Sequence, residues 1–234
     1  MGRDRWTPIE RELRKTVGPL IAGVDEVGRG PLAGPVVACA VVMPPDVRAI
    51  PGVNDSKQLT AAERERLAVK IRERAISYGI GAASVREIDR VNIYHATVIA
   101  MRRALARLSV TPNHVLIDGK AIRTLETKHT AIVEGDDKCY SIACASILAK
   151  VTRDRAMHLL APRYPTYSWD SNVGYATAAH LGGINAFGVT PHHRRSFVAN
   201  RQLSLDFGAT DDVVVELDAL ALAEAAEAEV EPPR

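Results

Sequence analysis

The chain has 234 residues, 47% apolar but only 5% aromatic, which suits one large domain with a mainly aliphatic core. It has no run of about 18 apolar residues, and its first fifteen residues are rich in charge. These features argue against a membrane-spanning helix and a secretory signal, so we expect a cytoplasmic protein. The cysteines Cys39, Cys139 and Cys144 form no CxxC pair, so we expect reduced, buried thiols rather than a zinc site.

Charge is distributed unevenly along the chain, although the net charge is only +2. Residues 206–234 contain nine acidic residues and one basic residue, whereas residues 1–205 contain 29 basic and 19 acidic residues. A basic body followed by an acidic tail is a weak indication of a polyanionic partner such as a nucleic acid.

Hydrophobic patterning predicts a lead-in followed by strands and helices in alternation. Residues 1–19 are polar, and we expect a loosely attached lead-in helix there. Apolar runs that end at turn residues or carboxylates predict strands at 20–26, 36–43, 78–84, 115–118 and 129–133. Helical periodicity predicts helices at 60–77, 85–108, 141–160 and 176–187; the first begins with a capping box of Thr60 and Glu63, and the second is interrupted near Asn92.

Five strands interleaved with helices predict an α/β fold. The first two strands follow one another without a helix between them, which predicts a mixed sheet rather than a strictly parallel one. We expect residues 20–200 to form a single domain that ends in a helical region broken by proline and glycine. Residues 201–234 are expected to form an acidic tail.

Four carboxylates stand where predicted strands or turns end: Asp25 and Glu26 in GVDEVGRG, Asp118 in VLIDG, and Asp136 in VEGDDK. Strand ends beside glycine expose side chains at a sheet edge, where α/β proteins bind ligands. Neighbouring residues on a strand face opposite ways. Asp25 and Glu26 therefore share a site only if the strand breaks there, or if one of them acts through its main-chain carbonyl.

A cluster of carboxylates suits Mg²⁺ or Mn²⁺, because a divalent cation relieves the repulsion between them and both ions prefer oxygen ligands. Two such ions can promote phosphodiester hydrolysis. The alternatives are turn-forming aspartates with no shared role and the paired carboxylates of a glycosidase. The scarcity of aromatic residues for stacking on sugars argues against the glycosidase.

A series of motifs runs in order from about residue 20 to residue 197: GVDEVGRGPLAGPVVACAVV, NDSKQLT, EIDRVNIYHAT, VLIDGK, VEGDDK, IACASILAKVTRDRAM, YPTYSW, GYAT and HHRRSF. This series resembles the ribonuclease HII family, and the pair DEVGRG and SILAKVTRDR is highly specific. The resemblance implies a ribonuclease H-like mixed five-stranded sheet flanked by helices, with a C-terminal helical region. It also implies that Asp25, Glu26, Asp118 and Asp136 are the catalytic, metal-binding set, with two Mg²⁺ or Mn²⁺ ions during catalysis.

The activity that the resemblance implies is that of a metal-dependent endoribonuclease. Such an enzyme hydrolyses the RNA strand of RNA–DNA hybrids and incises duplex DNA 5′ of embedded ribonucleotides, giving a 3′-hydroxyl and a 5′-phosphate. Ribonuclease HIII resembles the chain too, but it usually carries an extra N-terminal domain, so ribonuclease HII is favoured. A non-catalytic hybrid-binding protein is the remaining alternative, and four clustered carboxylates near phosphates argue against it.

Further residues have substrate roles implied by the resemblance. Gly28, Arg29 and Gly30 are expected to approach the RNA–DNA junction through their main chain, since glycines allow close contact and the 2′-hydroxyl marks RNA. Tyr175 is expected to pack on the deoxyribose after the ribonucleotide. The family commonly has a lysine before Gly-Tyr, and Val173 stands there instead, so one phosphate contact is in doubt.

Basic residues near the motifs are candidates for phosphate contact, with a solvated surface charge as the alternative. Lys57 is expected to bind substrate, and Asp154 is expected to be structural or to support the site from behind. The other candidates are Lys150, Arg153, Arg194 and Arg195.

The segment Gln202–Phe207 (QLSLDF) resembles the short peptides with which bacterial replication proteins bind the sliding clamp. This resemblance suggests the clamp as a partner. Leu203, Leu205 and Phe207 would be the apolar anchors of the segment in an extended conformation. The alternative is a terminal strand or turn that packs on the body. Otherwise we expect a monomer whose partners are RNA–DNA hybrids and ribonucleotide-containing duplexes, with no membrane.

Overall fold

The computed structural model of the chain describes residues 7–45 and 47–199. They form the expected mixed sheet, with the strand order β3-β2-β1-β4-β5. β1 is antiparallel to β2 and parallel to β4, and β4 is parallel to β5. Every predicted strand is confirmed to within one residue at each end. The strands are β1 (Ile21–Val27), β2 (Val36–Val42), β3 (Ser77–Ala83), β4 (His114–Asp118) and β5 (His129–Ile132).

Tertiary contacts divide the chain into two compact units. The sheet unit comprises Met1–Val27, Val37–Ala82 and Thr97–Val151. The helical unit comprises Gly28–Val36, Ala83–Ala96 and Thr152–Arg234. Helices α3 (Val85–Ala106) and α5 (Tyr140–Leu160) each contribute residues to both units.

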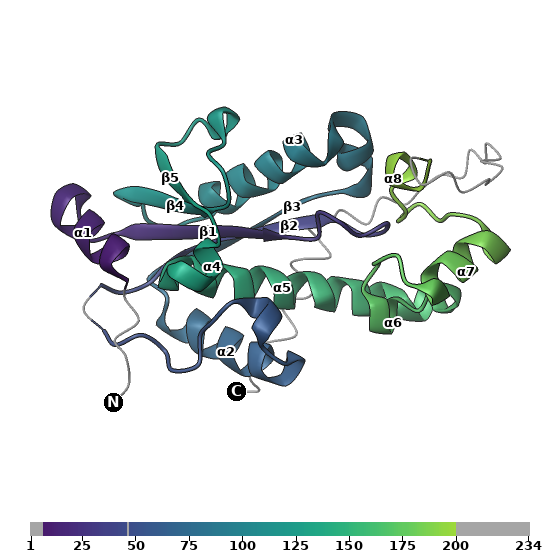
Figure 1. Cartoon of the computed structure of the whole chain (residues 1–234), viewed down its shortest axis with the longest axis horizontal. Helices are drawn as coiled ribbons and strands as arrows, with labels where there is room; N and C mark the ends of the chain where they lie inside the picture. The colour runs from purple at the N-terminus through teal and green to yellow at the C-terminus, as the bar shows by residue number, and fades with distance from the viewer. Residues whose placement is uncertain (1–6, 46, 200–234) are drawn as a thin grey trace. The chain divides into compact units, whose positions relative to one another are not determined.

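In the sheet unit, helices cover both faces of the sheet. α3 runs along one face, and α2 (Ala61–Arg74) and α5 lie against the other (Figure 1). Two glycines show how closely the layers pack, because a Cβ on Gly23 would overlap the main chain of Ser141 and a Cβ on Gly81 would overlap that of Ala100. The strands here thus require glycine for the close approach of helix to sheet.

Helix α1 (Pro8–Val17) begins with a capping box of Thr7 and Glu10. The expectation of a loosely attached lead-in is wrong, because the Glu10 carboxylate is fully buried at the start of α5. It accepts hydrogen bonds from the main-chain N–H of Tyr140 (3.1 Å), the N–H of Ser141 (2.9 Å) and the Ser141 hydroxyl (2.7 Å). Glu10 therefore satisfies amides at the start of α5 that have no partner within the helix.

The predicted capping box of one further helix and the predicted interruption of another are both confirmed. Thr60 and Glu63 form the capping box of α2, which ends at Arg74 rather than near residue 77 because Ala75 is already extended. Within α3, Asn92 has a φ of 67°, and its side-chain oxygen accepts from the N–H groups of Tyr94 and His95. Asn92 therefore ends one helical segment and caps the next, as the predicted interruption requires.

The helical unit contains the predicted C-terminal helical region, with α6 (Trp169–Asn172), α7 (Ala178–Phe187) and α8 (Arg195–Ala199). Its apolar cluster contains the fully buried Trp169, Met157 and Leu32. Only α7 was predicted, since helices of four or five residues show no useful periodicity. The short α4 (Gly135–Lys138) of the sheet unit was missed for the same reason.

The composition led to two expectations, one about the burial of the cysteines and one about membrane-spanning helices. Cys39, Cys139 and Cys144 are buried free thiols, as predicted. Within residues 7–45 and 47–199, no helix has the length and apolar character needed to cross a bilayer.

Candidate active site

The parallel pairing of β1, β4 and β5 places the ends of these strands at one edge of the sheet. Val24 lies beside Ile117, so Asp25 and Asp118 follow in neighbouring positions. After β5 the chain turns through Glu134, which has a left-handed φ of 57°, into α4. The Gly135 N–H donates to Asp118 Oδ1 at 2.6 Å, which holds α4 and its Asp136 against the end of β4.

Three of the four predicted carboxylates therefore converge. Asp25, Asp118 and Asp136 each offer an oxygen, and these oxygens lie within 4.8 Å of one another. Asp25 is 5% exposed and Asp136 is 6% exposed, whereas Asp118 is half-buried. Such a set of buried oxygen donors matches the preference of Mg²⁺ and Mn²⁺.

The electrostatics of this carboxylate centre also fit a divalent cation. Burial and the neighbouring carboxylates of Glu26 and Asp118 raise the pKa of Asp25 well above its usual value. Burial and the nearby Asp136 raise the pKa of Asp118. A raised carboxyl pKa means that the ionised form lacks sufficient positive compensation, and a bound cation supplies it. The residues therefore fit the metal that the resemblance implies.

Glu26 is half-buried and does not join the cluster of three oxygens found among the described residues. The strand does not break between Asp25 and Glu26, because Asp25, Glu26 and Val27 pair in regular register with β2. The sharp change comes two residues later, at Gly28 with a φ of 88°. Because the strand does not break here, the main-chain carbonyl is the route by which we expect Glu26 to act.

Lys57 lies at the carboxylate centre. Its ammonium is 3.0 Å from Asp136 Oδ2 and 3.8 Å from Asp55 Oδ1, while 76% of the side chain remains exposed. The Asp55 side chain also accepts from the Lys57 N–H, which fixes the start of this turn. Sequence reasoning singled out Lys57 for substrate, and the structure gives it a carboxylate partner as well.

In the helical unit, Arg194 is fully buried beneath the Gly28–Pro35 segment, which we call the GRG loop. Its guanidinium donates to the main-chain carbonyls of Gly28, Arg29, Gly34 and Pro35. A tight loop leaves carbonyls without sheet or helix partners, and the five N–H groups of arginine can satisfy several at once.

Arg153 has a similar position. It is fully buried and donates to the carbonyls of Ala33, Pro35 and Val173. Burial lowers the pKa of Arg153 to about 10 and, together with nearby Arg153, that of Arg194 to about 9. Direct phosphate contact and a solvated charge are therefore both wrong for these two arginines, because neither guanidinium reaches the surface. Their geometry matches the supporting role instead.

Tyr175 follows the strained turn at Val173 and Gly174. Its side chain is 42% exposed, and a Cβ built on Gly30 would lie 3.9 Å from its ring. The Gly174 carbonyl accepts from the N–H of Leu32 at 2.8 Å. The structure thus places the tyrosine beside the GRG loop, as the two predicted substrate roles require.

The remaining candidates are not members of the carboxylate group found among the described residues. Asp154 is half-buried next to Arg153 and is absent from the group of three aspartates found among the described residues, which favours the expected structural or supporting role. Lys150 is half-buried on α5. Arg195 is exposed, and its main-chain N–H donates to Asp89 at 3.0 Å.

Sequence reasoning missed Ser146, whose hydroxyl hydrogen-bonds to Asp25 and lies 2.8 Å from that of Ser56. It also missed His180, which lies buried beside His193. No local pattern marks either set, since their partners are distant in the chain.

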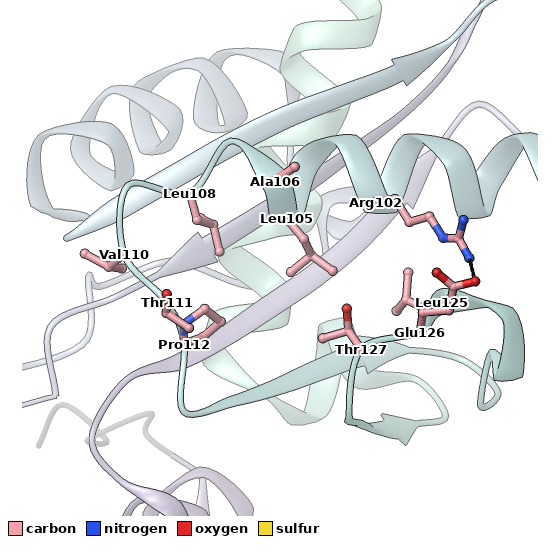
Figure 2. A pocket seen from close by; sticks show the side chains of 10 residues that line it. All are labelled: Arg102, Leu105, Ala106, Leu108, Val110, Thr111, Pro112, Leu125, Glu126 and Thr127. Carbon is pink, nitrogen blue, oxygen red and sulfur yellow. Dashed lines mark ion pairs between the residues drawn. The ribbon is translucent and has the colours of Figure 1, made fainter.

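A hollow of about 510 Å³ lies in the sheet unit, where the end of α3 faces the segments before β4 and β5 (Figure 2). Its two charged lining residues, Arg102 and Glu126, pair with one another at 2.7 Å. The rest of the lining is largely apolar, as Leu105 and Pro112 illustrate. None of the predicted site residues lines this hollow, so we assign it no part in the reaction.

The comparison with known families decides the family of the chain. The family model described as Ribonuclease HII matches residues 22–200. The chain belongs to the ribonuclease HII family. Ribonuclease HII of Granulibacter bethesdensis is 52% identical over 207 residues, which cover 86% of this chain and 94% of that protein. This chain is accordingly a type 2 ribonuclease H, a metal-dependent endoribonuclease.

Two solved structures show the same architecture. Ribonuclease H2 from Pyrococcus horikoshii has a TM-score of 0.65 and 29% identity, over 78% of this chain and 95% of its own. RNase HII from Archaeoglobus fulgidus, solved in complex with PCNA, has a TM-score of 0.65 and 26% identity, over 75% and 94% of the two chains. The ribonuclease H-like fold class predicted from the sequence is therefore confirmed.

Proposed function

We propose that this ribonuclease HII incises duplex DNA on the 5′ side of an embedded ribonucleotide and hydrolyses the RNA strand of RNA–DNA hybrids. The observation that carries the proposal is the convergence of Asp25 of β1, Asp118 of β4 and Asp136 of α4, whose oxygens lie within 4.8 Å of one another. A largely buried trio of carboxylates next to a polyanion is costly unless cations join it, which favours hydrolysis over passive binding.

Asp25, Asp118 and Asp136 would hold two Mg²⁺ or Mn²⁺ ions through their carboxylates, and Glu26 would contribute through its main-chain carbonyl. When bound, such ions supply a more acidic water and charge stabilisation for the leaving 3′-oxygen. The chain itself orients these donors: the Gly135 N–H fixes the Asp118 carboxylate, and the Ser146 hydroxyl fixes that of Asp25. Lys57, largely exposed beside Asp136, would contact a substrate phosphate.

Recognition of the ribonucleotide is assigned to the GRG loop and Tyr175. Gly28 and Gly30 have no side chain, so the main chain at Arg29 can approach a sugar and its 2′-hydroxyl closely. The exposed Tyr175 ring would pack on the deoxyribose that follows. Lys150 and Arg195, unlike the buried arginines, retain exposed surface and remain candidates for phosphate contact. The 2′-hydroxyl would be recognised and would not attack, so no cyclic phosphate forms.

The test is cleavage of a DNA duplex that contains one ribonucleotide, with an all-DNA duplex as the control and Mg²⁺ or Mn²⁺ present. We expect a single cut 5′ of the ribonucleotide that leaves a 3′-hydroxyl, and Asp118→Asn should abolish it while hybrid binding persists. A 2′,3′-cyclic phosphate product would contradict the mechanism. Cleavage of long hybrids alone would indicate ribonuclease HIII-like specificity, and no cleavage of either would indicate a non-catalytic binder.

A sliding clamp is proposed as a partner through Gln202–Phe207, which lies outside the described residues. The support is the peptide's likeness to clamp-binding segments and the Archaeoglobus fulgidus relative solved with PCNA. A pull-down with the purified bacterial clamp, comparing the wild type with the double variant Leu203→Ala/Phe207→Ala, tests it. Equal retention of the two proteins would remove the proposal.

A further inference from the structure

Two histidines meet in the interior of the helical unit, outside the residues assigned to metal or substrate. His180 of α7 is fully buried and His193 is 1% exposed. Their Nε2 atoms lie 3.0 Å apart, and the indole N–H of Trp169 donates to His180 Nε2 at 3.1 Å. Both rings therefore share polar contacts inside an apolar cluster, where each unsatisfied group would be costly.

Only one arrangement of protons satisfies every contact of the pair. The main-chain N–H of Thr190 donates to His193 Nδ1 at 2.9 Å, so this atom is an acceptor and the proton of neutral His193 sits on Nε2. Since the indole N–H of Trp169 is always a donor, His180 Nε2 is an acceptor. His193 therefore donates to His180, whose own proton sits on Nδ1.

The Nδ1 proton of His180 is directed at the main chain of Tyr175. His180 Nδ1 lies 2.9 Å from the main-chain carbonyl oxygen of Tyr175, which accepts the hydrogen bond. The hydrogen bonds thus run in one direction, from Thr190 through His193 and His180 to Tyr175. Burial lowers the pKa of both histidines, that of His193 to about 3, so the pair stays neutral and keeps this direction at ordinary pH.

The main chain of Tyr175 is held by further bonds. Its carbonyl also accepts from the Thr177 N–H at 2.8 Å, and its own N–H donates to the Asn172 carbonyl at 2.9 Å. The ring that this main chain carries is nevertheless 42% exposed. A rigid base under an exposed ring reduces the entropy lost when the ring packs on a ligand.

We propose that His180 and His193 are positioning residues for substrate selection, forming a directional hydrogen-bond relay that orients Tyr175 toward the sugar at the RNA–DNA junction. This inference rests on the substrate role proposed for Tyr175. It goes beyond that role by assigning selectivity to two buried side chains that touch no substrate.

The test compares two substrates with the full-length enzyme: a duplex with one ribonucleotide and a long RNA–DNA hybrid. The readout is the ratio of kcat/KM for the first to kcat/KM for the second. His180→Ala removes the donor to Tyr175 and should lower the ratio by roughly three- to tenfold, the usual effect of losing one such hydrogen bond. His180→Asn, whose amide can donate from nearly the position of Nδ1, should restore most of it.

His192→Ala is the matched control, because His192 packs against Trp169 (ring centroids 6.2 Å apart) but takes no part in the relay. It should leave the ratio unchanged even if the melting temperature falls. In a Tyr175→Ala background, His180→Ala should cause no further fall in the ratio, since a residue that acts through Tyr175 has nothing left to orient.

If His180→Ala does not fold, the pair His193→Gln and His193→Leu makes the same comparison, because glutamine keeps a donor near Nε2 and leucine does not. A ratio that falls in Tyr175→Ala but not in His180→Ala or His193→Leu would overturn the relay and leave the role of Tyr175 intact. A ratio unchanged in Tyr175→Ala would overturn both. A fall that His180→Asn reverses would support the relay.

Discussion

At the carboxylate centre three acidic side chains crowd together, and the pKa values of Asp25 and Asp118 are raised. Around the GRG loop two guanidinium groups are buried against neutral carbonyls, and the pKa values of Arg153 and Arg194 are lowered. Both regions hold charge out of water. They differ in where the compensation comes from: the first requires a cation from solution, whereas the second is satisfied by the chain's own hydrogen bonds.

This contrast predicts that the carboxylate centre should respond to bound cations, whereas the GRG loop should respond to the loss of an arginine. The carboxylates of the first region are already held in position before a cation binds, although they repel one another. A loop in which arginine side chains hold the carbonyls of Gly28, Arg29, Ala33, Gly34 and Pro35 keeps its shape without any ligand.

Replacing one ligand of the carboxylate centre should have the largest effect. Asp136→Asn removes a negative charge from the cluster of oxygens, and we expect cleavage of a ribonucleotide-containing duplex to fall by roughly a thousandfold or more. Asp137→Asn, on the same short helix but exposed, is the matched control and should retain nearly full activity. Initial rates at saturating Mg²⁺ measure both. Comparable losses in the two variants would mean that net charge, and not the cluster, matters.

Removing the support of the GRG loop should mainly cost stability. Arg194→Met deletes the hydrogen bonds to the Gly28, Arg29, Gly34 and Pro35 carbonyls, and we expect the free energy of unfolding to fall by about 3 kcal/mol. Urea unfolding without metal measures this. Arg195→Met, in which the neighbouring exposed arginine is replaced, should change it by less than about 0.5 kcal/mol. Equal urea midpoints for the two variants would contradict the supporting role of Arg194.

The buried histidines predict a dependence of stability on pH. Burial and the nearby His180 and His192 lower the pKa of folded His193 to about 3, below its unfolded value of about 6.5. As the pH falls below 6.5 the unfolded chain binds a proton that the folded chain does not, so stability falls. At pH 5 this loss amounts to about 2 kcal/mol.

The difference between wild type and His193→Gln isolates this effect from the carboxylates. The variant lacks the titrating group, so its unfolding free energy should fall less steeply between pH 7 and pH 5. Parallel curves for the two proteins would show that His193 titrates alike in the folded and unfolded chains.

The smallest expected effect concerns Val173. This β-branched residue has a φ of 43° and a ψ of 35°, a left-handed conformation that strains valine. Val173→Asn should raise the free energy of unfolding by about 0.5–1 kcal/mol, because asparagine tolerates this conformation. Val189→Asn, in the same apolar cluster but without a positive φ, should be destabilising. Thermal unfolding distinguishes the two, and destabilisation by both would mean that packing outweighs strain at Val173.

The sequence was sufficient for features governed by local pattern. The strands were predicted because their apolar runs end at turn residues or carboxylates. The capping box at Thr60 and the interruption near Asn92 were predicted because such signals act within a few residues. The grouping of Asp25, Asp118 and Asp136 was implied by the family resemblance, and the structure brings their oxygens within 4.8 Å of one another. Their catalytic role, like the domain boundaries and the substrate contacts, is still a prediction.

What the sequence could not provide were pairings between distant side chains and the main chain. Arg153 and Arg194 look like surface charges in the sequence, because all but one of the carbonyls that they bind lie more than a hundred residues away. Glu10 looks like an ordinary first-turn carboxylate until its bonds to Tyr140 and Ser141 are seen. The relay of His180 and His193 is hidden in the same way, since its end points are main-chain groups.

The parallel pairing of β1 with β4 has a consequence for synthesis on the ribosome. β1 and β2 are neighbours in the chain and can pair early. Asp118 can take its place beside Asp25 only after some ninety further residues have been synthesised. Non-local pairing of this kind forms late, because the intervening chain must close first. A nascent chain released before α4 is made therefore lacks part of the acidic cluster. Such a truncated product would have no nuclease activity.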